Sequence, residues 1–344
     1  MIVIDGSQGE GGGQIVRSAL ALSLVTGQPV TIERVRARRQ KPGLLQQHLT
    51  AVRAAAKIAD AEVDGDRMGS ARLVFRPGPV RAGDYAFRIG TAGSTTLVLQ
   101  TVLPALAIAD GDSTVTLEGG THNPLAPPYD YLARVYLPLL GRLGPRVTAT
   151  LVRPGFFPAG GGELTVAIHP ARQLGPWELL DRGPILARRV RALVANLPRH
   201  IAERECQTVA ASPGWDDAQC AVEEVRTARG PGNVLLIEIA AEHVTEMFTG
   251  FGQRGLRAET VAERTRAAAE NYVQADVPVG EHLADQLLLP LGIGAYQGTG
   301  GGVFRTTALT GHATTHIAVL REFLEVRIDV TESGANERLV RVGA

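Results

Sequence analysis

Two histidines at helical spacing are the side chains best suited to chemistry in this sequence. His312 and His316 are four residues apart and follow Gly311, so they share one face of the helix predicted over residues 312–323. A neutral imidazole beside the free N–H groups of a helix start could attack the α-phosphorus of a nucleotide. The two threonines between the histidines could donate hydrogen bonds to the phosphate oxygens. A nucleophile at His312 is therefore one interpretation of these residues.

Two other interpretations of the histidine pair remain open on these residues alone. The pair could be ordinary histidines at a polar helix start. A zinc site is disfavoured, because the metalloprotease pattern needs glutamate at position 313, where the chain has Ala313. No nearby cysteine supplies a further ligand either.

A glycine-rich segment near the amino terminus could bind phosphate. Residues 9–13 read GEGGG and follow the apolar run 2–4, and a helix with apolar residues at helical spacing is predicted over residues 14–25. Backbone N–H groups at a helix start favour phosphate oxygens, which suits a nucleotide. The segment matches neither GxxxxGK[ST] nor GxGxxG in its context. The alternative is a tight turn that needs glycine for positive φ angles.

The same segment carries polar side chains at helical spacing. Glu10, Gln14 and Arg17 follow the i, i+4, i+7 pattern, so they share a face if the helix begins early enough. They would then offer an acidic metal ligand, an amide and a guanidinium side by side.

A run of cations precedes a third polar cluster. Five basic residues fall within eight positions, just before the helix that bears Gln47 and His48. The guanidinium fork matches phosphate, so a triphosphate or an RNA end would fit such a cluster, whereas a solvated basic strand edge is the alternative. The five residues are Arg34, Arg36, Arg38, Arg39 and Lys41.

These residues need elements that position them, and glycine turns mark those elements. An apolar run, a glycine turn and a helix-like stretch recur along the chain, which predicts an α/β or α+β fold built from related units that pack sheets against helices. A further helix is predicted to start at Pro42-Gly43. The three instances cover residues 2–25, 85–107 and 306–323.

The glycine pattern lapses between about residues 187 and 274. Charged helical stretches at 201–211 and 256–273 flank one clear strand at 234–239. We therefore predict a smaller inserted α/β domain over residues 183–278, and a catalytic body formed by residues 1–182 and 279–344.

Composition limits the partners and the compartment. The 344 residues are 44% hydrophobic and carry 35 Lys and Arg against 35 Asp and Glu, so attraction of the whole surface to nucleic acid is not expected. No apolar run approaches the roughly 18 residues of a membrane span, and the amino terminus lacks a signal pattern, which predicts a cytoplasmic protein without a membrane partner. Cys206 and Cys220 form no CxxC pair and are interpreted as structural thiols rather than redox or zinc residues.

Taken together, these motifs resemble the RNA 3′-terminal phosphate cyclase family from end to end. The resemblance is carried by DGSQGEGGGQ with Arg17 and Ser18, KPGLLQQH, residues 93–100, GGTHNP, FPAGGG, PRHIAERE, LADQ, and His312 before Thr315. It implies an architecture like that of the enolpyruvylshikimate-type transferases with a smaller domain inserted near residues 183–278. The oligomeric state is not determined by these motifs.

The resemblance also implies a reaction and a set of roles. His312 would take AMP from ATP and pass it to an RNA 3′-terminal phosphate, and the 2′-hydroxyl would then displace AMP to form a 2′,3′-cyclic phosphate. Glu10 would hold Mg²⁺ or Mn²⁺. Gln14, Arg17, Arg36, Arg39, Gln47 and His48 would bind the nucleotide or RNA phosphates, and Gln100, Pro127, His282, Asp285 and Gln286 would contact the nucleoside.

The chain departs from its relatives at His282, where close bacterial relatives carry a tyrosine expected to stack on adenine. Imidazole stacks less extensively, which weakens the expected purine preference. The glycine-rich stretch 297–302 has no assigned role. A non-catalytic RNA-binding ribosome-assembly factor that uses the 34–41 cations is the alternative function, and an enolpyruvyl-type transferase is a third.

Overall fold

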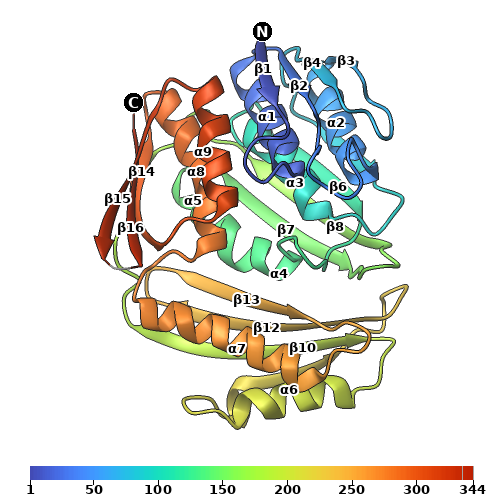
Figure 1. Cartoon of the computed structure of the whole chain (residues 1–344), viewed down its shortest axis with the longest axis vertical. Coiled ribbons are helices and arrows are strands. Elements are labelled where there is room, and N and C mark those ends of the chain that lie inside the picture. The colour runs from blue at the N-terminus through green and yellow to red at the C-terminus, as the bar shows by residue number, and fades with distance from the viewer. Residues whose placement is uncertain (335, 344) are drawn as a thin grey trace.

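The structure is a computed structural model that describes residues 1–334 and 336–343. Figure 1 shows a larger body that contains both chain ends and a smaller unit beneath it, formed by β10 to β13 with α6 and α7. No helix in the described ranges is long and apolar enough to cross a membrane.

The first two units of the body follow the same order of elements. Unit one contains β1 (Ile2–Asp5), α1 (Gly13–Thr26), β2 (Val30–Glu33), α2 (Gln46–Ala59), β3 (Glu62–Asp64) and β4 (Leu73–Arg76). Unit two contains β5 (Asp84–Arg88), α3 (Thr95–Leu106), β6 (Ser113–Gly119), the helical run α4 (Tyr129–Tyr131), η1 (Leu132–Tyr136) and α5 (Leu137–Arg142), then β7 (Arg146–Arg153) and β8 (Gly162–His169).

The third unit has the same order, but its first strand is separated from its first helix. It contains β9 (Pro176–Leu179), α8 (Glu281–Tyr296), β14 (Gly301–Thr307), α9 (Gly311–Phe323), β15 (Arg327–Gly334) and β16 (Glu337–Gly343). The smaller unit lies between β9 and α8. It contains β10 (Ile185–Ala195), α6 (His200–Ala210), η2 (Asp217–Gln219), β11 (Cys220–Glu224), β12 (Gly232–Ala241), β13 (Thr245–Phe251) and α7 (Ala258–Ala275).

Strand pairing establishes the repeat. Within the described residues each body sheet has four strands, in the orders β1-β2-β4-β3, β5-β6-β8-β7 and β9-β14-β16-β15. In every case the first pair is parallel and the next two pairs are antiparallel. The prediction of repeated sheet-and-helix units is confirmed. The third sequence instance at 306–323 is the second strand and second helix of its unit, so it corresponds to β2 and α2 rather than to β1 and α1.

Helices of different units pack together inside the body. α1 contacts α3 of unit two and α9 of unit three, and α8 contacts α9. One hydrophobic cluster runs through all three units, which explains why α1, α3 and α8 are apolar around most of their circumference. The amino-terminal ends of α1 and α9 are thereby brought to one place.

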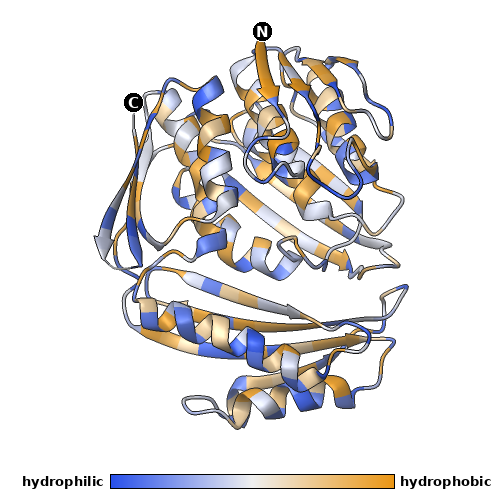
Figure 2. Cartoon of the chain, viewed as in Figure 1, coloured by the Kyte–Doolittle hydropathy of each residue, from blue (hydrophilic) through white to orange (hydrophobic). Residues whose placement is uncertain are grey.

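The inserted unit has a hydrophobic cluster of its own. Its sheet has the order β11-β10-β12-β13, and side chains of α6 and α7 cover one face. Figure 2 shows hydrophilic and hydrophobic residues alternating along α7, as expected for a helix with one face on a sheet. The predicted strand at 234–239 is confirmed as β12, and the helical stretches at 201–211 and 256–273 are confirmed as α6 and α7. The strands β10, β11 and β13 were not predicted. The boundaries at residues 183 and 278 stay a prediction.

The inserted unit buries a carboxyl group that should make its stability depend on pH. Glu205 on α6 is 0% exposed and accepts a hydrogen bond from Asn233 Nδ2 at 2.9 Å, and burial raises its pKa to about 7. The native protein therefore holds a proton that the unfolded chain releases above its pKa of 4.5. Stability should fall as pH rises between these two values.

We expect Glu205→Gln to remove the fall in stability that Glu205 causes as the pH rises. As the pH rises from 5 to 8, wild type should lose on the order of 2 kcal/mol of its free energy of unfolding that the variant keeps. Urea denaturation at several pH values measures the difference. Glu203→Gln on the same helix, where the side chain is 44% exposed, is the control and should keep the wild-type slope. Parallel pH profiles for Glu205→Gln and wild type would contradict the expectation.

Candidate active site

The glycine loop between β1 and α1 forms the floor of the site. Gly9 and Gly11 have φ angles of 50° and 55°, so the tight-turn interpretation holds alongside any role in binding. A Cβ atom on Gly13 would lie 2.3 Å from His48 Nε2, which only glycine avoids. α1 begins at Gly13, so Glu10 lies in the loop and the predicted helical face shared by Glu10, Gln14 and Arg17 is wrong.

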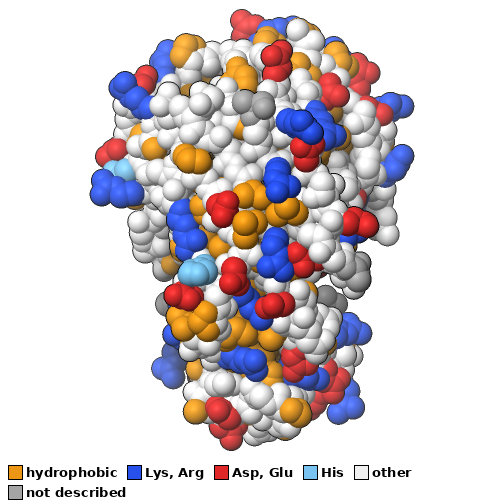
Figure 3. Space-filling model, turned by 90° about the vertical axis from the view of Figure 1, so that its left-hand side faces the viewer, with side chains coloured by type: hydrophobic (Ala, Val, Ile, Leu, Met, Phe, Trp, Pro, Cys, Tyr) orange, Lys and Arg blue, Asp and Glu red, His pale blue; other side chains and the backbone are white. Residues whose placement is uncertain are grey.

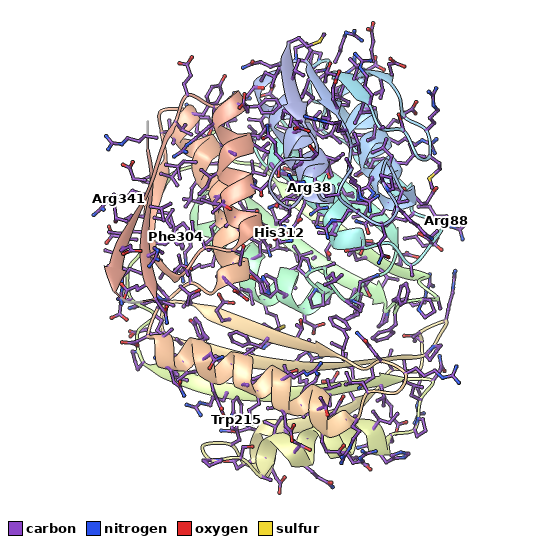
Figure 4. The ribbon with its side chains drawn as sticks, in the orientation of Figure 1. Arg38, Arg88, Trp215, Phe304, His312 and Arg341 are labelled. Carbon is purple, nitrogen blue, oxygen red and sulfur yellow. The ribbon has the colours of Figure 1, made fainter. Side chains whose placement is uncertain are left out.

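His312 lies in the first turn of α9, on the opposite side of this loop. Thr310 caps the helix, because its Oγ1 accepts a hydrogen bond from Ala313 N at 3.1 Å. Figure 4 shows His312 on the side of α9 that faces the amino-terminal segment bearing Arg38. The sequence suggested that the Thr315 hydroxyl could donate a hydrogen bond to a phosphate oxygen. In the structure Thr315 Oγ1 donates to Gly311 O at 2.7 Å, within the helix.

Gln14 fixes the orientation and the tautomer of the His312 ring. Gln14 Nε2 donates to both oxygens of Asp285, at 2.7 and 2.9 Å, which leaves Gln14 Oε1 as an acceptor. This oxygen lies 2.9 Å from His312 Nδ1. Nδ1 must then carry the proton, so the lone pair of the neutral ring is on Nε2.

The free nitrogen of His312 faces a carboxylate. His312 Nε2 lies 2.8 Å from Glu10 Oε2, and the two side chains are 47% and 37% exposed. A proton on Nε2 makes this contact an ion pair. Nε2 must lose that proton, or separate from Glu10, before it can act as a nucleophile.

Asp285 connects His312 to a second histidine. Burial raises the pKa of Asp285, but hydrogen bonds from His316 and Gln14 and the nearby His312 outweigh burial, so the net pKa lies below its ordinary value. His316 Nδ1 is 2.9 Å from Asp285 Oδ1, and His316 Nε2 is buried with no partner in the described part of the chain. The hydrogen bonds of the i, i+4 pair are therefore divided between Gln14 and Asp285.

Two basic groups flank the glycine loop. Burial lowers the pKa of Arg17 to about 10, against the opposing effect of the Asp285 carboxylate, so the guanidinium stays charged at neutral pH. It makes no direct hydrogen bond or ion pair among residues 1–334 and 336–343. Burial, followed by Arg36 and Arg17, lowers the pKa of His48 to about 3. His48 Nδ1 accepts from Leu45 N at 3.2 Å, so the ring proton is on Nε2, which adjoins Gly13.

Most of the 34–41 cations are engaged by the chain itself. Arg34 pairs with Asp5, and Arg38 donates to Gly9 O at 2.9 Å. Arg36 is 8% exposed and donates to the carbonyls of residues 41 and 43 at 2.8 and 2.7 Å, so it braces its own loop. Arg39 Nη2 lies 3.6 Å from Glu10 Oε2, and Glu10 in turn contacts His312. The cluster lies in the loop after β2 rather than on a strand edge, and binding of an anion by its exposed members stays a prediction.

A pocket lies between α1, α3, η1, α8 and α9, next to the two histidines. Five predicted nucleotide-binding residues line it together with side chains that the prediction missed. The predicted ones are Gln14, Arg17, Gln100, Asp285 and Gln286, and the others are Ser18, Leu103, Pro104, Tyr136, Leu289 and His316. His316 was noted in the sequence only as the i, i+4 partner of His312, and Ser18 only as part of the resemblance, so neither was assigned to the nucleotide. Tyr136 had no signal beyond helical position.

Three other predicted residues lie outside the lining of this pocket. Gln47 Oε1 accepts from Ser94 N at 2.6 Å, and Pro127 O accepts from Thr96 Oγ1 at 2.7 Å, so both are bound to the start of α3. His282 lies in the first turn of α8, and its side chain is 81% exposed. Any contact of these three residues with a nucleoside stays a prediction.

The residues offer one carboxylate for a divalent cation. No group of three or more His, Cys, Asp or Glu side chains that could hold a metal ion occurs in the described residues. Mg²⁺ is commonly held by one or two carboxylates together with substrate phosphates. Glu10, half-exposed beside the loop, fits that manner of binding.

Comparison with known proteins gives this arrangement a family. A family model described as RNA 3′-terminal phosphate cyclase matches residues 8–330. The chain belongs to this family. It is 52% identical over 332 residues to the RNA 3′-terminal phosphate cyclase of Koribacter versatilis, an alignment that covers 96% of this chain and 92% of the relative.

Other cyclases give similar values. The cyclase of Ectopseudomonas mendocina is 50% identical, with 99% of this chain and 97% of the relative covered. That of Salmonella typhimurium is 49% identical, with 99% and 98% covered. Among solved structures, the enolpyruvyl transferase NikO from Streptomyces tendae matches with a TM-score of 0.38 and 13% identity, over 99% of this chain and 48% of NikO. The fold assignment for this cyclase family member rests on its strand pairing rather than on that match.

The tautomer of His312 can be tested without measuring activity. Gln14→Leu removes the acceptor for Nδ1–H while keeping a similar volume, so the Nδ1-protonated fraction should fall from nearly complete to a minority. Nitrogen-15 NMR of labelled histidine side chains measures that fraction. His200 in the inserted unit is the internal control and should not change. An unchanged His312 tautomer in the variant would show that Gln14 does not set it.

Proposed function

We propose that this chain uses ATP to convert an RNA 3′-terminal phosphate into a 2′,3′-cyclic phosphate, with His312 as the residue that carries AMP. The main support is the position of His312, whose Nδ1 is held by Gln14 at 2.9 Å, so that Nε2 is the available nucleophile. The second support is Arg17, a charged guanidinium without a partner among the described residues. An anion is the group that such a guanidinium binds.

His312 would perform the first step. Nε2 forms a bond to the α-phosphorus of ATP, the bond between that phosphorus and the oxygen that bridges to the β-phosphorus breaks, and pyrophosphate leaves. Glu10 must release Nε2 before this attack. Arg17, Arg39 and the Nε2–H of His48 surround the glycine loop and would bind phosphate oxygens. Mg²⁺ or Mn²⁺, held by Glu10 and phosphate oxygens, would reduce the negative charge there.

Two further displacements complete the reaction. An oxygen of the RNA 3′-phosphate attacks the phosphorus bound to His312, so the N–P bond breaks and AMP passes to the RNA. The 2′-hydroxyl then loses its proton and attacks the 3′-phosphorus, and AMP leaves. Direct cyclisation would have to expel hydroxide or oxide, whereas the phosphoanhydride provides AMP as a leaving group, which is the benefit of a covalent intermediate.

The RNA must be held by local groups, because the net charge of the chain is zero. On the face in Figure 3, Lys and Arg side chains are interspersed with Asp and Glu rather than gathered into one basic patch. We assign the RNA end to the exposed residues Arg39 and Lys41 of the 34–41 loop, because Arg39 Nη2 lies 3.6 Å from Glu10 Oε2 in the proposed site. We place the reaction in the cytoplasm, where ATP and RNA ends meet.

Labelling with ATP that carries ³²P at the α-phosphate tests the proposal. In the presence of Mg²⁺ the wild type should acquire an acid-labile adenylate, and His312→Ala should acquire none. His169→Ala is the control, because His169 lies at the end of β8 with Asp112 as its partner, and it should label fully. No label on the wild type, combined with RNA binding that is indifferent to ATP and to the 3′ end, would instead support the assembly-factor alternative.

Arg17→Ala tests whether the unpaired guanidinium binds the nucleotide. Loss of a charged hydrogen bond to phosphate costs about 1.5–3 kcal/mol, so the Kd for ATP should rise about 10- to 100-fold. Calorimetric titration with a non-hydrolysable ATP analogue measures the Kd. Arg34→Ala is the matched control, since that arginine is paired with Asp5 outside the pocket, and it should change the Kd less than threefold. Equal effects of the two variants would remove Arg17 from the nucleotide site.

A further inference from the structure

The helix that carries Asp285 and Gln286 has no cap in its own sequence. α8 starts after Gly280, which has no side chain, and its third residue is the apolar Leu283. A capping box normally supplies a Glu or Gln at that third position to accept the N–H of the cap residue. α8 therefore needs an acceptor from elsewhere to complete its first turn.

That acceptor comes from the inserted unit. Glu246 on β13 accepts a hydrogen bond from Gly280 N through Oε1 at 2.6 Å. The two residues are 34 positions apart, and the contact is buried. In a capping box the third helix residue accepts the N–H of the cap residue. Here Glu246 accepts it instead, from a strand of a different sheet.

Glu246 is costly to keep in this place. Its side chain is 3% exposed, and burial raises its pKa to about 8. A buried carboxyl group destabilises a protein unless its hydrogen bonds compensate. Glu246 has no cation partner among the described residues, so its bond to Gly280 is the contact that links it to the body.

The segments around this contact are fixed by two arginines. Arg182, where the chain enters the inserted unit, binds Asp276 Oδ1 at 2.9 Å. Arg305 on β14 donates to the carbonyl oxygens of Leu180 at 2.8 Å and Asp276 at 3.4 Å. Both crossings between the body and the inserted unit are therefore bound to each other and to β14, the strand that precedes α9.

We infer that Glu246 is a positioning residue through which the inserted unit holds the first turns of α8, and with them Asp285 and Gln286, in place for the site. Asp285 lies five residues after Gly280 and binds both Gln14 and His316. Fraying of the start of α8 would loosen Asp285. Because Asp285 holds Gln14, and Gln14 holds the ring of His312, the orientation of His312 would then be less well fixed. The effect on nucleotide use rests on the proposed function, whereas the cap itself does not.

Three variants separate the cap from general stability. Glu246→Leu keeps a similar volume and removes the acceptor, and Glu246→Gln retains a carbonyl oxygen for Gly280 N–H. Glu205→Leu is the matched control, because Glu205 is equally buried in the same unit but binds Asn233 within that unit.

Hydrogen exchange of the full, nucleotide-free chain is the first measurement. In Glu246→Leu the amides of residues 281–286 should exchange about fivefold faster, which corresponds to loss of a typical cap. Glu246→Gln should stay within twofold of wild type. Glu205→Leu should leave these amides unchanged, even where it shifts the melting temperature. Unchanged exchange in Glu246→Leu, or equal acceleration in Glu205→Leu, would overturn the inference.

Adenylation kinetics are the second measurement. Glu246→Leu should raise the KM for ATP about threefold to tenfold, with rescue by Glu246→Gln and no change in Glu205→Leu. A wild type that forms no adenylate would overturn the proposed function while the exchange result still decides the role of Glu246. Faster exchange with an unchanged KM would confine Glu246 to local stability and would contradict a positioning role.

Discussion

The hydrogen bond between Gln14 and His312 is the interaction on which the site depends. An amide has one donating and one accepting end, and Asp285 takes the donating end of Gln14. The accepting end can then hold only a protonated Nδ1, which leaves the lone pair of the neutral ring on Nε2. The tautomer of His312 is thus set by a carboxylate that does not touch it, and the three residues come from three different helices.

This requirement explains the packing of the body. Gln14 belongs to the first repeat and His312 to the third, so their contact exists only because α1 lies against α9 in a common core. The close approach at Gly13 arises within the first repeat, where His48 of α2 contacts the first turn of α1. Fewer of the 34–41 cations are available for a ligand than their number in the sequence suggested. Arg34, Arg36 and Arg38 stabilise the loops around the site, which leaves Arg17 and Arg39 nearest to where a nucleotide would lie.

The sequence predicted the repeated architecture and the location of His312 at a helix start, because glycine turns and apolar periodicity are local signals. It placed Gln14 and Arg17 correctly in a helix over residues 14–25, but the face that they would share with Glu10 does not form, because the helix begins only at Gly13. It missed β10, because arginines at 188, 189 and 191 interrupt the apolar pattern. The carboxylates that pair with Arg189 and Arg191 are Glu238, Glu223 and Asp130, and they lie on other elements. The cap on α8 was also beyond local signals, since its two partners belong to different sheets. Residues brought together by tertiary contacts carry no spacing by which to recognise them.

The separation of Gln14 and His312 has a consequence for synthesis on the ribosome. The glycine loop and the first helix leave the exit tunnel early, whereas α9 is translated 298 residues after Gln14. A nascent chain that has emerged only through its second repeat carries the glycine loop but lacks the His312 imidazole. The contact between Gln14 and His312 therefore cannot form until nearly the whole chain has been translated.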